Sequence, residues 1–122
     1  LDELSGGQRQ MAFIAMVVAQ DTDYVFLDEP LNNLDIKHSV EIMQTLRRLA
    51  HEFNKAVVIV IHDSNFASCY SDNSVAMKKG KVVKSGKVAE VVEKSVMESI
   101  YEIPFEIREF DGVRICMYYS GR

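Results

Sequence analysis

The chain has 122 residues, of which 48% are hydrophobic and 26% charged, and its formal net charge is −4 at pH 7. This size and composition are those of one globular domain with a sizeable core, and they exclude a strongly basic nucleic-acid-binding protein. The longest apolar runs, residues 11–19 and 56–61, are shorter than the ~20 residues that span a bilayer. Cys69 and Cys116 have neither CxxC nor metal-binding spacing, so we expect free thiols in a reducing compartment.

A glycine-rich stretch opens the chain and leads into an apolar helix that should end near residue 20. Ser5 and Gln8 have the spacing of a capping box, and the nearly all-round apolar helix after them is predicted to be buried. Gly6 and Gly7 each cost a helix roughly 1 kcal/mol, whereas glycine is favoured where backbone approaches a ligand. Backbone N–H groups at a helix start bind phosphate, so Ser5, Gly6, Gly7 and Gln8 predict an anion site. A simple helix cap is the alternative interpretation.

A βαβ unit is predicted next. Residues Tyr24–Leu27 form a short buried strand, and Asp35 is the expected N-cap of an amphipathic helix over Ile36–Phe53. Residues Ala56–Ile61 form a second buried strand, which should run parallel to the first. The apolar positions of the helix recur at steps of three or four residues: Ile36, Val40, Met43, Leu46, Ala50 and Phe53.

Polar residues follow both strands of this unit. Asp28 and Glu29 come after the first strand and His62 after the second, and parallel neighbours bring these ends to one edge of the sheet. Asp28 is a candidate Mg²⁺ ligand, Glu29 a candidate base for an attacking water, and His62 a candidate γ-phosphate contact. The alternatives are solvated acids and a structural histidine. His38 and His51 lie on the polar side of the helix and are assigned no role.

The second half of the chain predicts short elements. These are a helix over Ser64–Tyr70, a hairpin of Ser74–Met77 and Lys81–Lys84, a helical turn at Lys87–Val92, a helix from the Ser95–Glu98 capping box to Glu102, and a hairpin of Phe105–Phe110 and Val113–Tyr119 around Asp111-Gly112.

Four motifs in this order resemble those of ATP-binding-cassette (ABC) ATPases. Leu4–Gln8 is similar to the signature motif, Tyr24–Glu29 to the Walker B strand with its catalytic glutamate, Asn32–Asp35 to the D-loop, and His62 to the switch histidine. The residues in and around these motifs resemble those of the ATPase subunits of bacterial iron–siderophore importers, with heme, vitamin B12 and other metal-chelate importers as close relatives.

The resemblance implies a partial P-loop NTPase fold of the α/β class, with ATP and Mg²⁺ as ligands. It implies catalytic roles for Glu29 and His62, a metal-binding role for Asp28, and nucleotide contacts from the signature residues and Asp35. It also implies a head-to-tail dimer with a second ATPase subunit, bound to transmembrane permease subunits at the cytoplasmic face of the membrane. No nucleic-acid partner is implied.

The sequence departs from the family in having no GxxxxGK[ST] motif. We therefore expect residues 1–122 to be the C-terminal part of an ABC-type nucleotide-binding domain and to be inactive alone. The alternative is a non-catalytic interaction module, against which Glu29 and His62 weigh because such a module does not need them. A chromosome-maintenance ATPase of the same superfamily would show long heptad segments, and the sequence has none.

Overall fold

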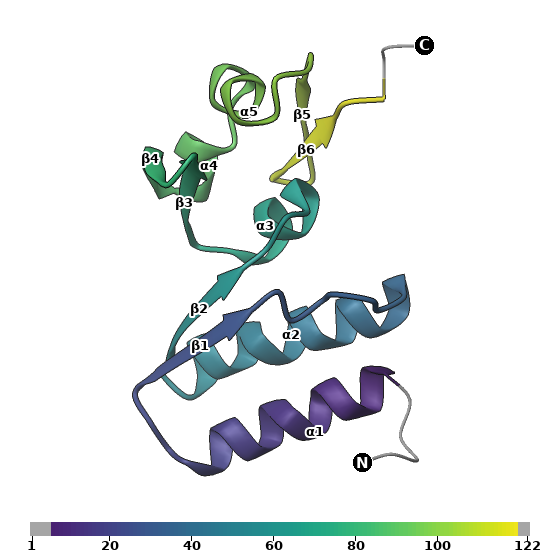
Figure 1. The fold of residues 1–122 in the computed structure, drawn as a ribbon, viewed down its shortest axis with the longest axis vertical. Helices are drawn as coiled ribbons and strands as arrows, with labels where there is room; N and C mark the ends of the chain where they lie inside the picture. The colour runs from purple at the N-terminus through teal and green to yellow at the C-terminus, as the bar shows by residue number, and fades with distance from the viewer. Residues whose placement is uncertain (1–5, 120–122) are drawn as a thin grey trace. The chain divides into compact units, whose positions relative to one another are not determined.

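The computed structural model describes residues 6–119, and the chain divides into two compact units, Leu1–His62 and Asp63–Arg122. Figure 1 shows the helices and strands of both units. The assignment of residues 1–122 to one domain stays a prediction. Of the helices among the described residues, none is long and apolar enough to cross a membrane.

The first unit contains the predicted βαβ arrangement. Strands β1 and β2 pair in parallel, in a register that runs from Tyr24 opposite Ala56 to Asp28 opposite Val60, which confirms the parallel prediction. Figure 1 shows α1 and α2 running side by side. The elements in chain order are α1 (Gly6–Ala19), β1 (Tyr24–Asp28), α2 (Ile36–Glu52) and β2 (Ala56–Val60).

Helix α2 begins and ends as its sequence predicts. The Asp35 carboxylate accepts a hydrogen bond of 2.8 Å from the backbone N–H of His38, and Asn54 follows the helix with a φ of 53°. Ile36 and Phe53 were predicted to face the core, but they are 79% and 59% exposed because they lie at the two ends of the helix. The buried positions of α2 are Ser39, Ile42, Met43, Leu46 and Leu49.

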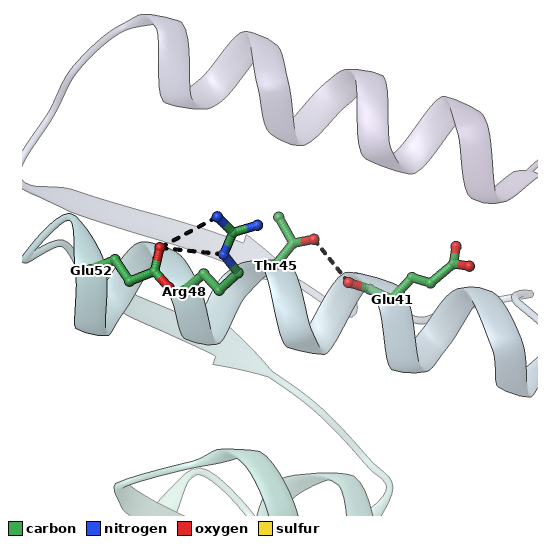
Figure 2. Close-up of polar contacts among 4 residues, drawn as sticks. All are labelled: Glu41, Thr45, Arg48 and Glu52. Atoms are coloured by element: carbon green, nitrogen blue, oxygen red, sulfur yellow. Dashed lines mark hydrogen bonds and ion pairs between the residues drawn. The ribbon is translucent and has the colours of Figure 1, made fainter.

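The outer side of α2 carries short-range polar contacts (Figure 2). The Thr45 hydroxyl donates to the carbonyl oxygen of Glu41 at 2.9 Å, and Arg48 Nε lies 3.3 Å from Glu52 Oε2. The Arg48 and Glu52 side chains are 69% and 56% exposed, so this pair stabilises the helix by only about 0.3–0.5 kcal/mol. The contacts mark this side of α2 as a solvated face.

The prediction that α1 and both strands are buried is wrong. In α1, Phe13 and Met16 are 53% and 58% exposed, because one side of this helix contacts α2 and the others are open. In β1, Val25 and Leu27 are buried whereas Tyr24 and Phe26 are exposed. An apolar run without alternation predicts cover on both faces, but within the described part of the first unit this sheet is covered only on the face that packs on α2.

The second unit consists of short helices and two antiparallel hairpins, as predicted. Strands β3 and β4 pair with each other, and so do β5 and β6. Both turns have two residues at positive φ, including Gly80 and Gly112, as type I′ hairpin turns require. The elements in chain order are α3 (Ser64–Tyr70), β3 (Asn73–Lys78), β4 (Lys81–Lys87), α4 (Val88–Val91), α5 (Lys94–Tyr101), β5 (Glu106–Phe110) and β6 (Val113–Met117).

The capping box predicted for α5 does not form. The helix begins at Lys94, two residues before the start that a Ser95 N-cap would give, so Ser95 is already inside it and Glu93 is the N-cap residue without a side-chain hydrogen bond. The carboxylate of Glu98 instead accepts a hydrogen bond of 3.2 Å from the backbone N–H of Phe105. Glu98 therefore supports the connection from α5 to β5.

The core of this unit lies between α5 and the β5–β6 hairpin. Asn65 joins α3 to the same hairpin through a two-way contact with the backbone of Cys116: its amide nitrogen donates to the carbonyl oxygen at 3.2 Å, and its amide oxygen accepts from the N–H at 2.7 Å. Burial raises the pKa of the Cys116 thiol, so this cysteine remains a protonated core residue. The buried cluster consists of Val92, Met97, Phe105 and Cys116.

Candidate functional site

The ends of β1 and β2 bring an acid and a histidine into contact. Asp28 is the last residue of β1 and lies opposite Val60, and the backbone N–H of Glu29 continues the ladder by donating to the Val60 carbonyl oxygen at 3.0 Å. Two residues beyond β2, His62 Nε2 hydrogen-bonds to Glu29 Oε1. The predicted convergence of Asp28, Glu29 and His62 at one sheet edge is therefore present.

The backbone at Glu29 has an uncommon conformation. Its φ is 50°, in the left-handed region that residues other than glycine rarely adopt. Pro30 after it is fully buried, and the carbonyl oxygen of Glu29 accepts a hydrogen bond of 3.1 Å from Asn32 N–H. These constraints hold the chain in a turn at the point where the Glu29 carboxylate leaves the sheet. Such conformations cluster at functional sites.

This sheet edge is accessible to ligands. The side chains of His62 and Glu29 are 80% and 40% exposed, and Asp28 is exposed as well. Protein-bound Mg²⁺ takes one or two carboxylates and completes its shell with water and phosphate oxygens. The exposed Asp28 carboxylate fits as such a ligand. The described residues contain no cluster of three or more His, Cys, Asp or Glu side chains arranged for a metal ion, so an all-protein cage does not fit here.

Packing against α2 explains why position 7, in the glycine-rich start of the chain, has no side chain. A Cβ atom on Gly7 would overlap the Cδ2 and Cγ atoms of the His38 ring and lie 2.9 Å from His38 Cβ. A Cβ on Gly6 would make an ordinary contact, 3.5 Å from Leu34 Cδ2. The absence of a side chain at Gly7 is thus explained by α2. The phosphate prediction stays a prediction and rests on the N–H groups of this helix start.

Of the residues of the predicted anion site, Gly6, Gly7 and Gln8 lie in the first turn of α1. Ser5 lies outside the described residues, so the predicted hydroxyl contact is a prediction only. Gly6 and Gln8 are exposed in the first turn of α1, and Gly7 is buried there. Gly6 and Gln8 are therefore open to a ligand that approaches the start of this helix.

Asp35 is occupied with capping α2. Beside the backbone bond, its Oδ1 accepts a hydrogen bond from His38 Nδ1 at 2.8 Å, since an ionised carboxylate only accepts. The backbone N–H of His38 is the main cause that lowers the pKa of Asp35, which burial opposes and the His38 side chain assists. Sequence reasoning assigned Asp35 to the nucleotide and gave His38 no role. The i, i+3 spacing from the N-cap was the signal that could have linked them.

Comparison with known proteins shows related sequences over nearly the whole chain. It is 62% identical over 120 residues to the petrobactin import ATP-binding protein YclP of Bacillus subtilis, covering 98% of this chain and 48% of that protein. It is 43% identical over 107 residues to the iron(3+)-hydroxamate import ATP-binding protein FhuC of the same species, covering 88% and 40%. The chain thus spans about half the length of these relatives or less. No protein-family model matches it.

Solved structures show the same fold. A metal-chelate-type ABC transporter in an inward-facing conformation matches with a TM-score of 0.85 over 98% of this chain and 49% of its own, at 23% sequence identity. The dimeric bacterial ABC transporter cassette MJ0796 matches with a TM-score of 0.63 and 37% identity, over 71% of this chain and 37% of its own. These matches confirm the predicted partial P-loop NTPase fold of the α/β class.

Proposed function

Because this chain is homologous over nearly its whole length to the ATP-binding proteins of iron–siderophore ABC importers, we propose that it takes part in the ATP hydrolysis that drives import of an iron chelate. The observation that carries this proposal is the contact between Glu29 and His62 at the exposed edge of the β1–β2 sheet. Hydrolysis of ATP uses a residue that orients or deprotonates the attacking water and donors that contact the transferred phosphate, and this pair could supply both.

Each residue at this edge has one proposed task. The Glu29 carboxylate orients the attacking water and accepts its proton, and the turn that fixes its backbone keeps that carboxylate in place. His62 bonds to Glu29 through Nε2 and contacts the γ-phosphate from its exposed position. Asp28 holds Mg²⁺, directly or through water, and the ion supplies neutralisation of phosphate charge when bound.

The two groups of site residues in the first unit serve different nucleotides in this mechanism. Residues 1–122 contain no P-loop motif to grip an ATP that faces Asp28, Glu29 and His62. Gly6, Gly7 and Gln8 at the start of α1, together with the preceding Ser5 of the signature motif, serve the phosphates of an ATP held by a second ATPase subunit. The Asp35 loop of this chain contacts the same ATP. The protein then works as a head-to-tail dimer on transmembrane permease subunits at the cytoplasmic membrane face. The dimeric state of the similar MJ0796 cassette supports this arrangement.

The competing candidate is a non-catalytic interaction module with a signature motif and a dimer surface. The Glu29–His62 contact favours the enzyme, because a module that only binds a partner has no use for a base and an imidazole in contact at an open edge. Import of another metal chelate would use the same hydrolysis site, so the site does not discriminate between chelates.

The test is a chimera in which residues 1–122 replace the matching segment of YclP, the 62% identical relative. We expect the purified chimera to hydrolyse ATP, and residues 1–122 alone to show no measurable turnover because they lack a P-loop. Uptake of iron-loaded petrobactin through the relative's own permease then tests the coupling to transport. A folded chimera that binds ATP but does not hydrolyse it would support the interaction module.

A further inference from the structure

His38 contacts two of the predicted nucleotide-binding segments of the first unit, the loop that ends at Asp35 and the first turn of α1. Its Nδ1 atom donates to Asp35 Oδ1 at 2.8 Å, and its side chain is 31% exposed. The other side of the same side chain occupies the space in which Gly7 lacks a Cβ atom, since that atom would overlap His38 Cγ and Cδ2. One imidazole therefore joins the loop after Glu29 to the first turn of α1.

A neighbouring contact joins the same two segments. Leu34, the residue before Asp35, has its Cδ2 atom 3.5 Å from the position of a Cβ on Gly6. Each of the two glycines thus faces a side chain from the region of Asp35. The close approach of α1 depends on both sides of the contact: glycine at position 7 admits the ring, and the bond to Asp35 holds the ring in place.

We propose that His38 is a positioning residue, which fixes the start of α1 relative to the loop of Leu34 and Asp35 so that both present their backbone groups in one geometry. This inference rests on the proposed ATP hydrolysis, because it concerns how the site is held together. A small displacement of groups that contact a reacting phosphate lowers the rate by as much as ~10²-fold, without weakening the nucleotide grip supplied elsewhere.

The kinetic test compares two histidine substitutions on the same helix, both made in the YclP chimera. His38→Ala removes the contact, and His51→Ala makes the same chemical change about 20 Å further along α2. We expect His38→Ala to lower kcat at least ~10-fold with KM for ATP within about 3-fold of the unsubstituted chimera, because positioning acts on the transition state. His51→Ala should leave both constants unchanged.

Conservative replacement separates positioning from bulk stability. His38→Asn places an amide donor close to the location of Nδ1 and so keeps the bond to Asp35. It should retain more of kcat than His38→Ala. If His38→Ala has the kcat of His51→Ala, or if His38→Asn is no better than His38→Ala, His38 does not position the site.

The contact itself is tested without ATP by a double-mutant cycle on residues 1–122. Gly7→Ala should lower Tm strongly in the chain that keeps His38. In the His38→Ala background it should lower Tm much less, because the new methyl group has room there. Additive changes would overturn the inference while leaving the proposed function intact. A strongly non-additive cycle together with an unsubstituted chimera that hydrolyses no ATP would have a different meaning. The contact between His38 and Gly7 would be established, but the proposed function, and with it the catalytic role of this contact, would be refuted.

Discussion

His62 Nε2 hydrogen-bonds to Glu29 Oε1 although the two residues are 33 positions apart in the sequence. The parallel register of β1 and β2 produces this contact, because it ends both strands at the same edge of the sheet. The sequence alone led to this juxtaposition through three steps: two apolar runs, a helix of the right length between them, and the parallel pairing that such a connection requires.

The His62 side chain is 80% exposed, so its removal should affect activity and not folding. We expect His62→Ala to change the free energy of unfolding of residues 1–122 by less than about 0.5 kcal/mol, as is usual for surface substitutions. In the YclP chimera it should lower ATP turnover at least ~10²-fold, the lower end for loss of a proton-transferring or phosphate-contacting group. A large fall in Tm, with turnover per folded molecule unchanged, would assign His62 a structural role instead.

Gly6 gives the cleanest test of the phosphate site at the start of α1. A side chain fits there, and aspartate in the first turn of a helix is favourable to its stability. Gly6→Asp should therefore leave Tm unchanged or raised, yet abolish ATP hydrolysis by the chimera through repulsion of phosphate. Gly6→Ala is the matched control without the charge. Equal turnover of the two variants would place the phosphate elsewhere.

The Asp35 cap gives a prediction for acid stability. Its pKa is lowered from 3.8 in the folded chain, chiefly by the His38 backbone N–H, so folding is favoured by ionisation of this carboxyl. That contribution is present above pH ~4 and is lost as pH falls through the lowered pKa. Asp35→Asn keeps a capping oxygen without the charge, so the decline of Tm below pH ~4 should be shallower than in the unsubstituted chain. Parallel curves from pH 2.5 to 6 would contradict it.

Asn65, in the first turn of α3, should be a sensitive position of the second unit. Asn65→Ala leaves the N–H and C=O of Cys116 without their side-chain partner in a residue that is 1% exposed. We expect a loss of roughly 1–3 kcal/mol in the free energy of unfolding, the cost of unsatisfied buried polar groups. Asn73→Ala, at an exposed position of β3, is the control. Urea titration of the two variants measures the difference, and equal midpoints would show that Asn65 is dispensable.

The sequence predicted element order, strand pairing and both hairpins because these depend on local signals: apolar runs, the Asp35 cap, and the turns at Gly80 and Gly112. It failed on burial. The exposed side chains of Phe13 and Phe26 follow from which faces have a neighbour, and this is a tertiary property that apolar content does not record.

The sequence likewise predicted part of the candidate site and missed another part. Asp28, Glu29 and His62 could be brought together from the sequence because strand ends define an edge. The link from His38 to Gly7 could not, since a glycine with no room for a Cβ looks the same in sequence as a glycine that faces a ligand.

The most direct test of the account is the ATP hydrolysis rate of the YclP chimera with Glu29 and with Glu29→Gln, at saturating ATP and Mg²⁺. Glutamine keeps the size of the side chain and its bond to His62 but cannot accept a proton from water. We expect the rate of Glu29→Gln to be at least ~10²-fold lower, with ATP binding retained and an ATP-bound dimer that accumulates on gel filtration. Turnover by Glu29→Gln within a few-fold of the unsubstituted chimera would contradict the assignment of Glu29 as the base, and with it the proposed site.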